Sequence, residues 1–265
     1  MQATLNGMSV VSHLQPASRL VRCSLYAVDG EIGTVEALYF DDMRWMVCYL
    51  LVDTGDWLED RRVLVSPVAV GEVKEDEKKI FIELTRHQVE NSPPLGTMQT
   101  VTRIYEAAYY RYYDWPVYWE DDRLCRIPTS SASPGAKPSA GTEAHTRGRE
   151  MRLQRTTVLD GCVIVAHDGA IGQIRDLIVD TRYWLIRYLA IETHRGQPGR
   201  LVLVSPSWID WVSWKDHLMN TGLASTAIDS APGFDPCSGI SRDYEVRLYR
   251  HYGRRGYWQR NNGMN

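Results

Sequence analysis

The side chains that most often carry catalysis occur in this sequence without the spacing that a reaction centre needs. The chain has five cysteines, at Cys23, Cys48, Cys125, Cys162 and Cys237. They form no C-x-x-C pair, and the seven histidines include no H-x-x-x-H pair for zinc. The sequence also lacks the G-x-S-x-G, P-loop and G-x-G-x-x-G patterns of hydrolases and nucleotide-binding enzymes. We therefore predict a non-enzymatic protein with no catalytic residue, no metal site and no cofactor.

Aromatic side chains with a polar tip are the most unusual chemical feature of the chain. Nine Trp and fifteen Tyr accompany only three Phe, and Tyr and Trp favour half-buried or interface positions. In residues 242–258, Arg alternates with Tyr, a mixture that could stack on bases and neutralise phosphates. The net charge of −3 gives no global attraction to nucleic acid. Any such binding would be local.

These residues lie in an internal repeat with a constant offset of 139 residues. The motif D-G-x-I-G at residues 29–33 returns at residues 168–172, and residues 29–67 align without a gap with residues 168–206. Sixteen of the thirty-nine aligned positions are identical. The offset also relates the aromatic tail of the first copy, with Arg103, Tyr105, Glu106, Tyr110, Arg111, Tyr113, Tyr118 and Trp119, to Arg242, Tyr244, Glu245, Tyr249, Arg250, Tyr252, Tyr257 and Trp258. A repeat with one constant offset predicts two similar structural units.

The segment between the copies has the composition of a flexible linker. Residues 130–148 are rich in Ser, Pro, Ala, Gly and Thr and show no apolar periodicity. We therefore predict a first domain at residues 1–122, a linker at 123–155 and a second domain at 156–265.

Short apolar runs separated by turn residues predict strands rather than helices within each unit. In the first copy the predicted strands are Val21–Val28, Ile32–Phe40, Trp45–Asp53, Arg62–Ser66, Val68–Lys74 and Lys79–Leu84. A short helix is predicted at residues 85–90, and a longer one at 102–113, where Glu106 could complete a capping box. Gly33 and Gly172 are expected at bends or close backbone approaches. Six short strands favour a small closed barrel, because closure removes exposed edges.

The motifs D-G-E-I-G-T-V-E-A-L-Y-F-D-D, W-M-V-C-Y-L-L-V-D-T-G and R-R-V-L-V-S-P, in this order, resemble the PRC-barrel family. The second copy, with D-G-A-I-G and L-V-L-V-S-P, looks like the same module. The resemblance covers residues 20–95 and 158–234. It implies a mainly β fold of two small PRC-type β-barrels, each followed by a short helix and an aromatic-rich helical tail. In the photosynthetic reaction-centre H subunit and in a ribosome-maturation factor, this barrel is a docking and assembly module. The family has no shared catalytic residue set.

The predicted function is therefore that of a docking or assembly scaffold for a protein complex. The resemblance suggests a cytoplasmic location, with the complex at the membrane surface, for example a photosynthetic or respiratory complex, and unpaired cysteines fit a reducing compartment. The alternative is a ribosome- or RNA-associated factor that uses the basic C-terminal tail. Nucleic acid is the less favoured partner, because the first tail runs into Glu120-Asp121-Asp122, which would repel phosphates. The protein partner is unknown, and a homodimer is one alternative.

The residues predicted to contact a partner are aromatic positions and one Arg. Four Trp residues lack a counterpart in the other copy, and five further residues come from the second tail. The full set is Trp57, Trp208, Trp211, Trp214, Tyr244, Tyr249, Arg250, Tyr252 and Trp258. The favoured interpretation is that each tail docks on a barrel, its own or a neighbour's, with a protein groove and RNA as alternatives. The Trp at positions 45 and 184 and the Tyr at 49 and 188 are expected in the core or between the barrels.

The acidic residues of the repeat allow two interpretations. Asp29, Asp41, Asp42 and Asp53, with Asp168, Asp180 and Glu192, could form an oxygen-rich cation site. Asp also favours turns and strand ends, where it bonds nearby backbone groups. We favour the turn interpretation, because the offset repeats the turns and not a ligand loop.

Overall fold

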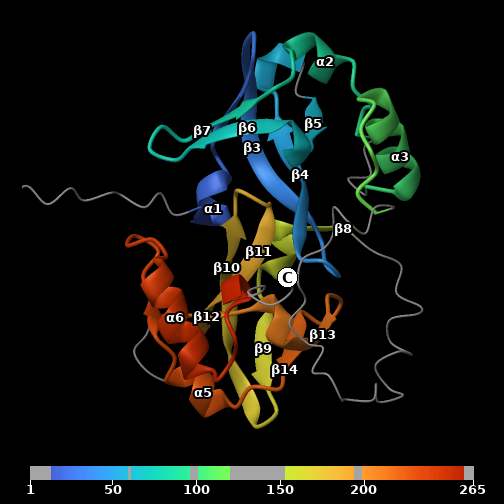
Figure 1. Ribbon diagram of the computed structural model, residues 1–265. Coiled ribbons are helices and arrows are strands. Elements are labelled where there is room, and N and C mark those ends of the chain that lie inside the picture. The colour runs from blue at the N-terminus through green and yellow to red at the C-terminus, as the bar shows by residue number, and fades with distance from the viewer. Residues whose placement is uncertain (1–12, 59–60, 96–100, 120–152, 194–198, 260–265) are drawn as a thin grey trace, which may run out of the picture.

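The protein is mainly β, with one mixed sheet and a few short helices. The computed structural model describes residues 13–58, 61–95, 101–119, 153–193 and 199–259 (Figure 1). We call residues 13–119 the first half and residues 153–259 the second half; in Figure 1 the first half, coloured blue to green, lies above the second, coloured yellow to red.

Six strands of the first half follow the sequence prediction, with ends shifted by up to three residues. They are β2 (Ser24–Ala27), β3 (Gly30–Asp41), β4 (Met46–Asp53), β5 (Arg62–Val65), β6 (Val70–Lys74) and β7 (Lys79–Ile82). Their hydrogen-bonded order is β5-β4-β3-β2-β7-β6, and only the β2–β7 pair is parallel. This order is open, with β5 and β6 at its two ends. The closed barrel inferred from the sequence therefore stays a prediction.

Two helices of the first half begin at the residues that the sequence indicated. Thr85 caps α2 (Arg86–Glu90) in a capping box with Gln88. Thr102 caps α3 (Arg103–Tyr112) by accepting a hydrogen bond from the N–H of Tyr105. The predicted capping role of Glu106 is wrong: its side chain is buried and has other partners.

The second half repeats this connectivity at the sequence offset of 139. Its elements are β9 (Val163–Ala166), β10 (Gly169–Asp180), β11 (Leu185–Thr193), β12 (Leu201–Val204), β13 (Ile209–Ser213), β14 (Leu218–Thr221), α5 (Ser225–Asp229), β15 (Gly233–Phe234) and α6 (Arg242–His251). The order is β12-β11-β10-β9-β14-β13, and the β9–β14 pair is parallel. The 3-10 turns η2 (Pro67–Ala69) and η4 (Pro206–Trp208) are related by the same offset, and η3 (Thr156–Leu159) is the counterpart of the four-residue helix α1 (Ala17–Leu20). Two further 3-10 turns are η1 (Gly55–Leu58) and η5 (Tyr257–Gln259).

Gly33 and Gly172 permit the close approach of two neighbouring strands in each half. A Cβ atom at Gly33 would collide with the backbone of Asp53, and one at Gly172 with the backbone of Glu192. Each glycine lies opposite the end of the long neighbouring strand, where any side chain would push the pair apart. The structure confirms the sequence expectation for these two positions.

The two halves exchange their first strands with each other. β1 (Leu14–Pro16) pairs with β10, with Leu14 opposite Asp180, and β8 (Leu153–Arg155) pairs with β3, with Leu153 opposite Asp41. Both registers are related by the offset of 139. The predicted linker at 123–155 therefore ends too late, because its last three residues form β8. Residues 120–152 lie outside the described part of the chain.

The halves also meet at the centre of the sheet. The N–H of Val47 donates to the carbonyl of Trp184, and the N–H of Ile186 donates to the carbonyl of Trp45, at 2.8 and 2.7 Å. Both Trp residues adopt a positive φ, 53° and 54°. Because the largest cluster of buried apolar side chains includes residues from both halves, the interface is part of one core. Among the described residues, no helix has the length and apolar character needed to cross a lipid bilayer.

Candidate functional site

Each half ends in a tail that packs against that half. We call residues 101–119 the first tail and residues 240–259 the second tail. Glu106 of α3 is 2% exposed and accepts hydrogen bonds from the hydroxyl groups of Tyr118 and Tyr49, at 2.8 and 3.3 Å. Arg103 donates to its other oxygen at 2.9 Å. This buried carboxylate joins β4, the tail helix and the turn after it.

The second tail repeats the same arrangement. Glu245 is also 2% exposed and accepts from the hydroxyl groups of Tyr188 and Tyr257, at 2.6 and 3.0 Å. Arg242 lies 2.7 Å from its other oxygen. Burial raises the pKa of both glutamates above the ordinary value, and the Tyr hydroxyl and Arg partners partly counteract this rise. A buried carboxylate requires such partners, so the hydrogen bonds of each buried glutamate hold the tail against its half.

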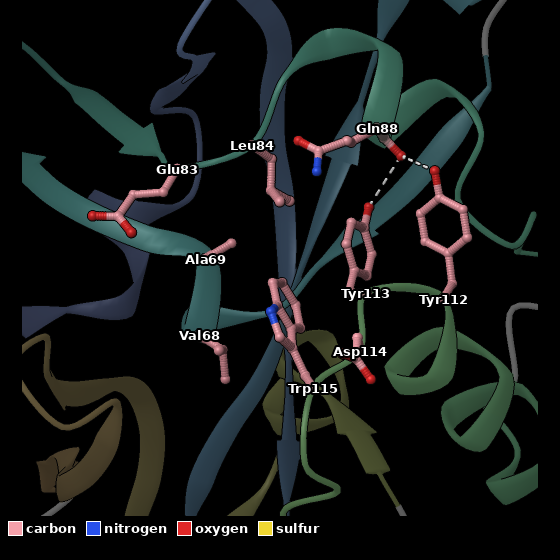
Figure 2. Close-up of a pocket in the computed structure, with 9 residues that line it drawn as sticks. All are labelled: Val68, Ala69, Glu83, Leu84, Gln88, Tyr112, Tyr113, Asp114 and Trp115. Atoms are coloured by element: carbon pink, nitrogen blue, oxygen red, sulfur yellow. Dashed lines mark hydrogen bonds between the residues drawn. The ribbon is translucent and has the colours of Figure 1, made fainter.

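A cavity lies where the first tail leaves its helix. It has a volume of about 460 Å³, and Figure 2 shows its nine lining residues, Val68, Ala69, Glu83, Leu84, Gln88, Tyr112, Tyr113, Asp114 and Trp115. The hydroxyl groups of Tyr112 and Tyr113 both donate to the carbonyl of Gln88, at 3.0 and 3.4 Å. These bonds fix the end of the tail against α2 and hold the cavity open between them.

The walls of this cavity combine apolar and polar groups, and part of its rim is exposed. The ring of Trp115 stacks on Tyr113 with centroids 4.5 Å apart. Val68 is 60% exposed and Tyr112 is 41% exposed, and both lie at the edge of the cavity (Figure 2). Two acidic residues, Glu83 and Asp114, are also exposed. The site could therefore accept an apolar group from solution.

The second half covers its tail tyrosines with a different Trp. Trp208 stands at the position of Ala69 and is 6% exposed. Its ring contacts Tyr252 and Tyr249, with centroids 4.8 and 5.2 Å away. In the first half the counterparts of these two tyrosines lie 4.5 and 6.4 Å from the ring of Trp115, so each half places a Trp on this pair from a different element.

The structure places the nine predicted interaction residues in different environments. Trp208, Tyr244, Tyr249 and Tyr252 are buried against their own half, and their contact with an external partner stays a prediction. Tyr244 donates to the carbonyl of Pro232 at 3.0 Å. The tails dock on their own halves, which is one of the two docking modes that the favoured interpretation of the sequence allowed.

The remaining predicted residues are partly or fully accessible. Trp211 is 46% exposed and Arg250 is exposed. Trp57 lies under the guanidinium of Arg86, and Trp258 lies under that of Arg242, at 4.5 and 4.4 Å from the ring centroids. Whether they bind a partner stays a prediction.

Trp214 connects the two halves. Its indole N–H donates to Asp42 at 2.5 Å, and its ring lies edge-on to Phe40, 5.9 Å away. The sequence predicted that Trp214 is exposed and contacts a partner, whereas the structure packs it between the two halves. Trp45 lies in the same cluster, as expected for a residue between the halves.

The acidic residues of the repeat serve turns and helix starts. Asp29 accepts from the N–H of Arg86, and Asp168 accepts from the N–H and hydroxyl of Ser225, so each carboxylate holds the start of a helix. In the described part of the chain, no three His, Cys, Asp or Glu residues gather as metal ligands. Cys162 lies 3.7 Å from the Nδ1 atom of His217, but burial raises the pKa of its thiol to about 11.

Part of the chain is similar to a known family. The family model of the PRC-barrel domain matches residues 15–89, from β1 through β7 into α2. This part of the first half is therefore similar to a PRC-barrel domain. The matched range ends before the first tail, so the matched segment supplies one wall of the cavity and the tail supplies the other. No curated protein matches the chain. The PRC-barrel domain is a protein-interaction type of domain.

Sequence reasoning missed the cavity because its lining comes from three separate segments. Residues 68–69 belong to η2, residues 83–88 lead into α2, and residues 112–115 belong to the first tail. The cavity depends on the tail docking beside residue 69, which a sequence pattern does not specify.

Proposed function

We propose that this protein is a non-enzymatic docking module, built from two copies of a PRC-barrel unit, that holds a partner protein in the cavity of the first half. The observation that carries the proposal is the cavity of about 460 Å³ beside the first tail, whose rim includes the exposed side chains of Val68 and Tyr112. Apolar surface that stays exposed in a folded protein is typical of an interaction site.

The relation between the halves supports the proposal of two equivalent units. The strand registers, the buried Glu clusters and the exchanged first strands are all related by one offset. Because each half lends a strand to the other, the pair would move as one body. Such an arrangement holds the cavity of the first half at a fixed position relative to the second half, as an assembly scaffold requires.

The groups around the cavity support binding rather than catalysis. The tyrosine hydroxyls are occupied by the carbonyl of Gln88, and Glu83 and Asp114 lie exposed at the rim. A general acid or base at pH 7 needs a perturbed and positioned group. The predicted cytoplasmic location and the association with a photosynthetic or respiratory complex stay predictions.

The test compares two variants of the full chain as bait in extracts of the native cell. Ala69→Trp places a large side chain in the wall of the cavity and should block it, whereas Trp211→Ala removes an exposed Trp elsewhere. We expect a protein that is retained by the wild type and by Trp211→Ala but lost from Ala69→Trp. If Ala69→Trp retains the same proteins as the wild type, the cavity is not the docking site.

A further inference from the structure

The tail helix of the first half carries an apolar stripe on its outer face. α3 lies at the outer edge of this half (Figure 1). Ile104, Ala108 and Tyr112 are four positions apart, so their side chains share one face of the helix. Ile104 is 85% exposed, Tyr112 is 41% exposed, and Ala108 is exposed as well. The opposite face, with Glu106 and Tyr109, is buried against the half. A surface helix usually has a polar outer face, and α3 does not.

The second tail has polar residues at the equivalent positions. At the offset of 139, the stripe of α3 corresponds to Asp243, Arg247 and His251 of α6, and all three are exposed. The two helices have the same length, a hydroxyl cap at the same position and a buried Glu at the same position. The fold therefore accepts polar side chains along this face, and Ile104 and Ala108 are not needed to hold the tail in place. Exposed apolar side chains that the fold does not require are typical of an interaction surface.

A groove with two arginines lies beside the stripe. It has a volume of about 690 Å³, and its lining, which includes no acidic residue, is Arg103, Ala107, Arg111, Trp115, Val117 and Trp119. Arg111 follows Ala108 by three positions, so the two are neighbours on the helix surface. Arg103 pairs with Glu106 at 2.9 Å. Among the described residues, Arg111 has no acidic partner, so its exposed charge is available to another molecule.

The stripe and the charge together specify the kind of occupant. Small side chains at a contact let two helices approach closely, and Ala108 stands at the centre of the stripe. The charge of Arg111 favours a carboxylate on the occupant. A second copy of α3 offers no such group on its outer face, because the one acidic residue of this helix, Glu106, is buried. An amphipathic helix with an acidic edge meets both conditions.

We propose that the outer face of α3 binds an amphipathic helix of another protein. Its apolar side chains pack on the stripe of Ile104, Ala108 and Tyr112, and an acidic side chain at its edge pairs with Arg111. Because an exposed ion pair contributes little, the apolar contacts supply most of the affinity and the charge supplies preference. Tyr112 is the one residue of the stripe that also lines the cavity. The inference therefore adds a contact surface that adjoins the proposed docking cavity and is tested separately from it.

The test selects peptides from a phage library of 16-residue helices, with the full chain as the target. A triple variant that carries the stripe of the second tail, Ile104→Asp, Ala108→Arg and Tyr112→His, removes the peptides that bind elsewhere. We expect the selected peptides to repeat apolar residues every three or four positions and to contain more Asp and Glu than the unselected library. No enrichment over the triple variant, or enrichment without an acidic excess, would overturn the inference.

Single variants of the full chain then locate the contact, with one selected peptide labelled with fluorescein and followed by fluorescence anisotropy. Ile104→Ser should weaken binding about tenfold or more, because it removes the burial of one Ile side chain. Arg111→Gln should weaken binding about two- to fivefold and make it less sensitive to salt. Val28→Ser and Arg247→Gln remove an exposed apolar side chain and an exposed Arg elsewhere, and should leave the affinity unchanged. Circular dichroism of each variant establishes that it is folded.

Several results would overturn the inference. Equal affinities of the wild type and Ile104→Ser would refute the apolar stripe, and an unchanged affinity of Arg111→Gln would refute the acidic contact. Loss of the peptide from folded Ala69→Trp would place it in the cavity instead, whereas its retention there would separate the stripe from the docking cavity, even if a native partner is lost. A concentration-dependent dimer in sedimentation velocity that Ile104→Ser dissociates would make the occupant a second copy of the chain.

Discussion

Residues 69 and 115 show that each half covers its tail tyrosines with a Trp from a different element. Trp115 stacks on Tyr113 in the first half, whereas Trp208, at the position of Ala69, packs on Tyr252 in the second. Ala69 and Trp208 stand at equivalent turns, η2 and η4, each capped by a Ser that accepts from the residue two positions later. The backbone of the two turns is thus the same, and the side chains around it differ.

Both substitutions at these turns should lower stability. Ala69→Trp should lower the free energy of unfolding by about 1–3 kcal/mol, because it overpacks a buried position beside Trp115. Trp208→Ala should lower it by about 3–5 kcal/mol by creating a cavity. Urea unfolding followed by circular dichroism measures both. A neutral Trp208→Ala would contradict its place in the core of the second half.

Asp114 and Gly253 occupy equivalent positions in the two tails, and both have a positive φ. Asp114→Gly should relieve the positive φ and raise the thermal midpoint by about 2–4 °C, and Gly253→Asp should lower it by a similar amount. Calorimetry of both variants checks the sign. A lower midpoint for Asp114→Gly would show that its carboxylate stabilises the tail more than its backbone strains it.

The buried glutamates predict a pH dependence of stability. Their pKa values are raised by burial, so the folded state holds these protons more tightly than the unfolded state, whose Glu pKa is about 4.3. Their stabilising contribution is complete below that value and is lost as the pH rises through the raised pKa. The advantage of the wild type over the double variant Glu106→Gln, Glu245→Gln should therefore shrink from pH 4 towards pH 7 in urea unfolding. An advantage that grows with pH would contradict the direction of these pKa values.

At the scale of elements, the exchanged strands β1 and β8 join the halves. Removing residues 1–16 deletes β1, which pairs with residues 178–180 of β10. We expect hydrogen exchange of the amides in this part of β10 to accelerate, measured by mass spectrometry, with little change in β3, which pairs with β8. A chain that lacks only residues 1–12 keeps β1 and is the matched control. Unchanged exchange in β10 after removal of residues 1–16 would show that the strand contributes little.

The sequence predicted the long strands and missed the short ones for a physical reason. β3 and β4 combine an alternating or continuous apolar pattern with Asp-Gly or Asp-Asp turns, which are local signals. β1 and β8 have three residues each, and their partners lie more than a hundred positions away. A strand defined by a distant partner has no periodicity of its own, so residues 153–155 were assigned to the linker.

In the tail helices, a local sequence pattern also failed to predict the role of one residue, Glu106. Glu106 lies three positions after Arg103 and matched a capping pattern, but the cap is made by Thr102 with the N–H of Tyr105. Glu106 faces inward because Tyr49 and Tyr118 offer hydroxyl donors inside the half. Tertiary partners override a local pattern when burial gives a carboxylate three hydrogen bonds. The repetition of Glu and Tyr in both copies was visible, but their mutual contact was not.

At the scale of the whole molecule, the contacts that join the two halves come in pairs, and the members of each pair are related by the repeat. The central backbone bonds between Trp45 and Ile186 and between Val47 and Trp184 are matched by the exchange of β1 and β8. Such contacts are typical of the two-fold interface of a symmetric dimer. The side chains break this symmetry beside the tails, where Trp115 packs in the first half and Trp208 in the second.

The most direct test of the account places a photo-cross-linking group at the rim of the cavity of the first half. Val68 is 60% exposed there, so p-benzoylphenylalanine in its place should remain accessible and leave the fold intact. After irradiation in the native cell, mass spectrometry should find an adduct with a partner protein, and the adduct should disappear in the Ala69→Trp background. The same adducts in both backgrounds, or none at all in the wild type, would contradict the assignment of the cavity as the docking site.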